Sequence, residues 1–120
     1  MQLNEIDYGE AVPIDGYGEG YFRIAGQAVK APLLVNAKGA KSWSGFDDAQ
    51  TVLEFCRDID VLFVGTGREI AHIPHAFRSV LEAAGIGVEL MNSASASRTY
   101  NVLLSEDRRV AAALLPIESV

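Results

Sequence analysis

Two segments carry the residue types that could hold an anion, and the first is Gly65-Thr66-Gly67, directly after the apolar run Val61–Val64. Glycines let the backbone turn sharply and leave amide groups open to a ligand. In open α/β sheets, sites form at the carboxyl ends of such strands. The turn lacks the Lys-Ser/Thr ending of a P-loop and the third glycine of a dinucleotide fingerprint. A tight strand-to-loop turn without a ligand is therefore the competing interpretation.

The second segment runs from Ser93 to Asn101 and combines small residues with an arginine. The free amides and the dipole of a helix start attract negative charge, and Arg98 could add a bidentate contact. The competing interpretation is a close-packed helix end with Arg98 paired to an internal acid. We take the candidate anion- or partner-binding residues to be Gly65, Thr66, Gly67, Ser97, Arg98, Thr99, Tyr100 and Asn101, with Tyr100 or Trp43 as a stacking wall.

The remaining reactive side chains do not form a recognisable catalytic or metal-binding pattern. His72 and His75 are the only histidines, and Pro74 breaks the helical spacing that would align them on a metal. Cys56 falls on an apolar helical stripe and is expected to be a small buried hydrophobe. We therefore predict no catalytic residues, no metal and no cofactor. Asp107-Arg108-Arg109 is expected to be a solvated turn, although two adjacent arginines could also serve a protein partner.

The elements that would position these residues alternate in a way that indicates an α/β fold. Val61–Val64 reads as a central strand buried on both faces, since it is an uninterrupted apolar run. Repeated strand–helix alternation predicts a parallel or mixed sheet with helices on its faces. We expect strands at 21–24, 28–30, 33–35, 61–64, 88–91 and 110–117, helices at 48–57, 74–84 and 93–105, turns at 13–20 and 36–45, and a loose arm at 1–12.

Composition indicates one globular domain spanning residues 1–120. Hydrophobic residues make up 49% of the chain and charged residues 22%, and the formal net charge is −6. That negative charge argues against nonspecific nucleic-acid binding. The longest apolar run, Val110–Leu115, is too short for a transmembrane span, and Met1–Glu10 resembles neither a secretory signal nor a transit peptide. A single cysteine fits a reducing compartment, so we expect a soluble cytoplasmic protein.

Several segments taken together resemble one known family. They are Tyr17–Ile24, the isolated Trp43, Val64-Gly65-Thr66-Gly67, and above all Arg98-Thr99-Tyr100-Asn101-Val102-Leu103-Leu104 with the basic and apolar run at 108–114. This pattern is similar to the family of mitochondrial complex I assembly factor 3 and its small bacterial and archaeal relatives. The similarity covers roughly residues 13–117.

The resemblance implies a compact three-layer α/β domain with a mixed central sheet flanked by helices. It also implies a non-enzymatic role in assembling respiratory NADH:quinone oxidoreductase, with other proteins as partners, and for the prokaryotic relatives no established activity. Without a transit peptide, the chain would be a bacterial member. Two positions depart from the family pattern, because Ser93 stands where threonine is usual and Ser97 where cysteine is usual. Cysteine chemistry at position 97 is thereby excluded. Binding of a small anionic metabolite or nucleotide at 65–67 and the start of the third helix is the alternative function.

Overall fold

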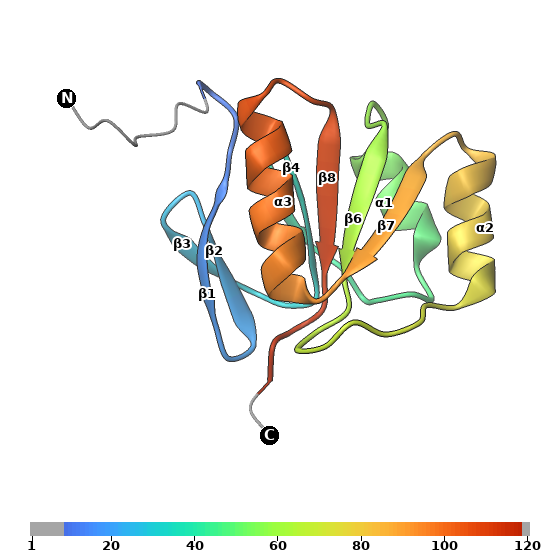
Figure 1. Ribbon diagram of the computed structural model, residues 1–120, viewed down its shortest axis with the longest axis horizontal. Helices are drawn as coiled ribbons and strands as arrows, with labels where there is room; N and C mark the ends of the chain where they lie inside the picture. Colours follow the sequence, from blue (N-terminus) through green and yellow to red (C-terminus); the bar gives the residue numbers. More distant parts are fainter. Residues whose placement is uncertain (1–8, 119–120) are drawn as a thin grey trace.

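A five-stranded mixed sheet forms the middle layer of the domain, as the computed structural model shows for residues 9–118 (Figure 1). Its strands are β4 (Leu33–Asn36), β5 (Gly39–Ser42), β6 (Val61–Gly65), β7 (Gly87–Met91) and β8 (Val110–Leu114). Their order is β5-β4-β8-β6-β7. β6 runs parallel to both β7 and β8, whereas β4 is antiparallel to β5 and β8. The expected mixed sheet is confirmed.

Two separate cores lie on the two faces of this sheet because successive side chains of a strand point to opposite faces. In β6, Leu62 and Val64 enter one core, and Phe63 between them enters the other. β8 divides in the same way, and all five of its residues are buried. An apolar run without alternation is what burial on both faces requires. The predicted burial of the 61–64 segment is confirmed, although β8 rather than β6 is the middle strand.

Helices α1 (Ala49–Phe55) and α2 (His75–Ala83) cover one face of the sheet. Asp48 caps α1 by accepting a hydrogen bond from the Thr51 amide, which supplies one of the partners that a helix start lacks. Trp43 is buried here and its indole Nε1 donates to the Asp48 carbonyl at 3.0 Å. Trp43 therefore packs in this core with a partner for its indole N–H.

Helix α3 (Ser93–Ser105) and a small antiparallel sheet cover the opposite face. The small sheet consists of β1 (Ile14–Gly18), β2 (Tyr21–Ile24) and β3 (Gln27–Lys30). Figure 1 shows α3 in front of the large sheet with the small sheet beside it. The domain therefore has three layers, as expected from the family resemblance.

Two segments expected to be turns are strands instead. The glycine-rich 13–20 segment contains β1, which shifts register against β2 between Ile14 and Gly16 and turns only at Glu19 and Gly20. The 36–45 segment contains β5, an edge strand. Its residues have low intrinsic strand preference, and pairing with β4 holds them in the strand conformation. The last strand ends at Leu114 rather than at residue 117.

Within 9–118, no helix is both long and apolar enough to cross a bilayer. Of the expected N-terminal arm, residues 1–8 lie outside the described part.

Candidate functional site

Ser93 joins the glycine turn to the start of α3. Its hydroxyl accepts a hydrogen bond from the Gly67 amide at 2.8 Å and donates to the Leu115 carbonyl at 2.8 Å. The Ser93 amide in turn donates to the Gly67 carbonyl at 2.8 Å. Because Ser93 is fully buried, these bonds satisfy polar groups that water cannot reach. The structure thus brings the glycine turn and the helix start into direct contact.

The backbone amides of the glycine turn bind groups of the protein itself. The Thr66 amide donates to the Met91 carbonyl at 2.9 Å, and the Gly67 amide donates to Ser93. The Thr66 hydroxyl fastens the following loop by donating to the Glu69 carbonyl and accepting from the Ala71 amide. An anion at this turn would have to compete with these internal bonds. Anion binding by residues 65–67 stays a prediction.

Three of the candidate residues on α3 point into the protein. The Ser97 hydroxyl donates to the Ser93 carbonyl at 2.9 Å, and the Tyr100 hydroxyl donates to the Val12 carbonyl at 3.1 Å. Asn101 accepts from the Ile14 amide through Oδ1 and donates to the Ile14 carbonyl through Nδ2. Tyr100 and Asn101 thus tie α3 to the chain at the start of the small sheet, whereas the Ser97 bond stays within α3. Burial raises the pKa of Tyr100, which keeps its phenol protonated.

Arg98 and Val102 point outward from α3, one helical turn apart. The Arg98 guanidinium donates to the Ser95 hydroxyl at 3.2 Å, and Val102 is 51% exposed. No ion pair of Arg98 is found within residues 9–118, so the expected pairing with an internal acid does not occur there. Thr99 is half-buried beside them. Arg98 is thus available to an external partner, whereas Gly67 is buried beneath Ser93.

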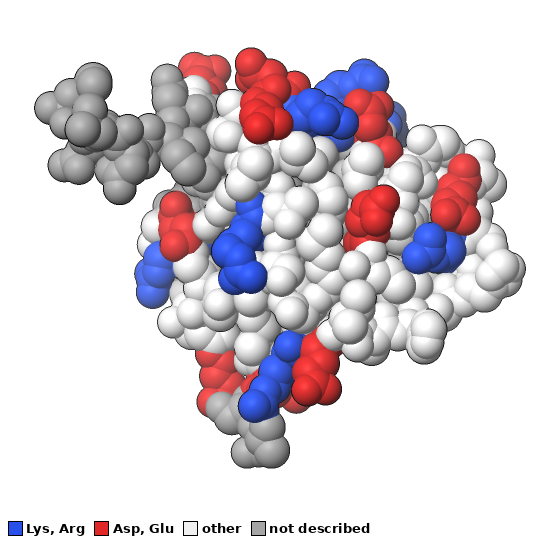
Figure 2. Space-filling model, in the orientation of Figure 1, with Lys and Arg blue, Asp and Glu red and all other residues white. Residues whose placement is uncertain are grey.

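The face that carries α3 has few charged side chains. Figure 2 shows mostly uncharged surface over α3 and the strands beside it, interrupted by basic atoms over α3 and acidic atoms near β7, with the other charged side chains around the margin of this view. Few charges and an exposed aliphatic side chain are typical of the central part of a protein interface.

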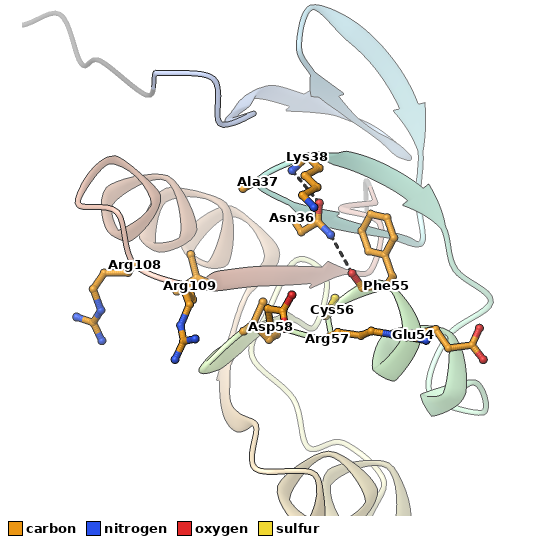
Figure 3. A pocket seen from close by; sticks show the side chains of 12 residues that line it. Asn36, Ala37, Lys38, Glu54, Phe55, Cys56, Arg57, Asp58, Arg108 and Arg109 are labelled. Atoms are coloured by element: carbon orange, nitrogen blue, oxygen red, sulfur yellow. Dashed lines mark hydrogen bonds between the residues drawn. The ribbon is translucent and has the colours of Figure 1, made fainter.

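A hollow of about 370 Å³ lies at the opposite edge of the sheet, where β6 and β8 begin (Figure 3). Three segments far apart in sequence line it, namely 36–38, 54–59 and 108–110. The sequence pattern did not indicate this hollow. The one available signal was the Arg108-Arg109 pair, which we expected to lie in a solvated turn or to serve a protein partner.

Cys56 lies at the base of this hollow and is 1% exposed. Burial raises the pKa of its thiol to about 12, because the thiolate loses its hydration. His72 and His75 are exposed and far from it in sequence. Within residues 9–118, no group of three or more His, Cys, Asp or Glu side chains is arranged to hold a metal ion.

We expect the Cys56 thiol to react with Ellman's reagent at pH 8 only when the protein unfolds. With a pKa of about 12, roughly one thiol in ten thousand is ionised at that pH, and the thiolate is the reacting form. The measurement compares absorbance traces in buffer and in guanidinium chloride, where the whole thiol content should react within minutes. Equal rates in the two solutions would show that Cys56 is accessible and ionised in the folded protein.

The protein is a small three-layer α/β domain with a mixed sheet. Its glycine turn contacts the start of α3, and one side of α3 faces the solvent. Residues 14–115 match the family described as "Protein of unknown function (DUF498/DUF598)". The chain belongs to this family.

Its relatives include proteins with and without a named role. An uncharacterized protein of Rhodobacter capsulatus is 49% identical over 98% of this chain and 94% of its own length. NADH dehydrogenase [ubiquinone] 1 alpha subcomplex assembly factor 3 of Xenopus tropicalis is 31% identical over 97% of this chain, which spans 67% of that protein. The resemblance to the complex I assembly factor 3 family is confirmed.

Solved structures show the same fold. A structure described as an outer membrane protein from Bartonella henselae has a TM-score of 0.79 at 37% identity and covers 95% of this chain and 100% of its own. A Mth938-like domain from Bordetella pertussis has a TM-score of 0.77 at 28% identity, covering 100% of this chain and 96% of its own.

Proposed function

We propose that this chain is a protein-interaction factor that assists the assembly of respiratory NADH:quinone oxidoreductase and acts from the cytoplasm. The proposal rests on the solvent-facing side of α3. Arg98 and Val102 are exposed there, and the surrounding surface carries few charged side chains. The relatives named assembly factor 3 support the choice of partner.

The contact on α3 would combine a cation with an aliphatic side chain. Arginine is enriched among residues that dominate interface energetics, because its planar guanidinium forms several hydrogen bonds and also packs. Ser95 already holds the guanidinium through one hydrogen bond, which lowers the entropy lost when a partner binds. Tyr100 and Asn101 fix α3 to the rest of the domain from its inner side. In this proposal the inner residues position the helix and the outer residues make the contact.

The test is affinity purification of the tagged full chain from detergent-solubilised lysate of its native host, read by mass spectrometry. We expect subunits or assembly proteins of NADH:quinone oxidoreductase to be enriched. Arg98→Glu should reduce that enrichment about tenfold or more, since loss of an interface arginine commonly costs over 1 kcal/mol.

The matched control is Arg23→Glu, which makes the same charge change on β2. Arg23 is exposed, and its neighbours Phe22 and Ile24 face the core, so it lies on the outer side of the small sheet. Enrichment that is equal for wild type and Arg98→Glu would remove α3 as the contact surface. Absence of oxidoreductase subunits and assembly proteins from the wild-type sample would refute the proposed function itself.

A further inference from the structure

Hydrogen bonds fix the segments that line the hollow at the amino ends of β6 and β8. The side-chain Nδ2 of Asn36 donates to the Phe55 carbonyl at 2.9 Å, and Asn36 Oδ1 accepts from the backbone amide of Lys38 at 2.9 Å. Figure 3 shows the first of these bonds spanning from β4 to the end of α1. On the other side, the Asp60 amide donates to the Arg109 carbonyl at 2.8 Å. These bonds join 36–38 to the end of α1, and 108–110 to Asp60 directly after the 54–59 segment, so the cavity exists before any ligand arrives.

Cations are concentrated around this hollow. Four of the ten Lys and Arg residues of the chain are among its lining residues, together with two acids, Glu54 and Asp58. The lining therefore carries a net charge of +2 in a chain whose net charge is −6. The four cations are Lys38, Arg57, Arg108 and Arg109.

Only one of these cations has an ion-pair partner in the part of the chain that the structure describes. Arg109 donates to both carboxylate oxygens of Asp60, at 2.8 and 3.3 Å. Lys38, Arg57 and Arg108 form no ion pair within residues 9–118. All three are exposed, which leaves their charged groups free to turn toward a ligand.

Helix ends explain part of this charge. α1 and α3 both end at this edge, and each carboxyl end carries roughly half a negative charge that favours nearby cations. Together the two ends would balance about one cation. Lys38 follows a strand rather than a helix, so its presence here has no such explanation. Lys38, Arg57 and Arg108 thus line a preformed cavity without an ion pair within residues 9–118.

We propose that this hollow binds a small organic phosphate. Its volume falls within the range of small-molecule sites, about 300–1,000 Å³. Lys38, Arg57 and Arg108 would contact the phosphate, because a dianion matches several cations better than a carboxylate does. Phe55 and Ile59 supply apolar surface for the organic part. This site is separate from the α3 face and does not depend on the proposed assembly role.

The experiment is a ¹H–¹⁵N NMR titration of the full chain with phenyl phosphate at pH 7, with benzyl alcohol as the uncharged control probe. We expect saturable shifts of amides in 36–38, 56–59 and 108–110 with phenyl phosphate and none there with benzyl alcohol. Arg57→Ser and Arg108→Ser should each weaken binding about tenfold, as loss of a charge-assisted contact does. Arg23→Ser makes the same charge change on the outer side of β2 and should bind like wild type.

A second arm separates the two sources of a phosphate group by adding vesicles of phosphatidylcholine with phosphatidic acid. Binding to these vesicles that depends on Arg57 and Arg108, without binding of phenyl phosphate, would assign the hollow to a lipid headgroup. Absence of both interactions would overturn the proposal. So would shifts that are equal in wild type and both variants, or shifts confined to 65–67 and 98.

Discussion

Replacing Tyr100 with alanine is expected to lower the free energy of unfolding by about 4 kcal/mol, in the range found for loss of large aromatic side chains. Tyr100 is fully buried in the core between α3, the large sheet and the small sheet. Its hydroxyl also donates to the Val12 carbonyl. Alanine would therefore leave a cavity and cut one tie between α3 and the N-terminal segment. Urea unfolding followed by circular dichroism measures the change.

Tyr100→Phe separates the two contributions. Phenylalanine keeps the ring in the core and removes only the hydroxyl, so we expect a loss of about 1 kcal/mol, the usual net contribution of one hydrogen bond. If both variants lost the same amount, packing of the Tyr100 ring would contribute nothing. That result would contradict the core described here.

Gly65→Ala is expected to destabilise the domain by about 3 kcal/mol, at the upper end of the usual range for overpacking. A methyl group at Gly65 would lie 2.7 Å from both the Cα and the Oγ of Ser93 and 2.9 Å from Leu114 Cδ2. One of these neighbours is backbone at the start of α3, so it cannot move aside as a side chain could. The substitution would push α3 away from β6 and disturb the Ser93 hydrogen bonds. Thermal unfolding monitored by calorimetry reports the loss.

Gly16→Ala is the matched control for this effect. A methyl group there meets nothing within 4 Å, and the residue has no positive φ. We expect its free energy of unfolding to stay within about 1 kcal/mol of wild type, as for a glycine replaced in compatible backbone. Equal losses in the two variants would mean that close contact with Ser93 is not why glycine is needed at position 65.

The parts of the fold that sequence predicts are those with strong local signals. The strand predicted at 61–64 and the helix predicted at 93–105 correspond to β6 and α3. Asn92 accepts a hydrogen bond from the Ser95 amide, as its position before a helix indicates. β1 and β5 were missed because glycine and polar residues have low strand preference. Their strand conformation comes from pairing with β2 and β4.

The candidate site was predictable only in part. Small residues at 93–97 indicated a close approach of backbone, and the contact between Ser93 and Gly65 shows why. Sequence could not show that Tyr100 and Asn101 face inward while Arg98 faces outward, since the partners of the first two are at Val12 and Ile14, almost ninety residues away. The hollow beside Cys56 depends on the strand order β4-β8-β6, which brings distant segments together. No local pattern encodes that order.

The most direct test of the assembly proposal is NADH:quinone oxidoreductase activity in membranes of the native host after deletion of this gene. We expect activity and the amount of assembled enzyme to fall in the deletion strain and to return with the wild-type gene or Arg23→Glu. Arg98→Glu, produced at the same level, should fail to restore them. Unchanged activity in the deletion strain, or full restoration by Arg98→Glu, would contradict the claim that α3 of this chain acts in assembly.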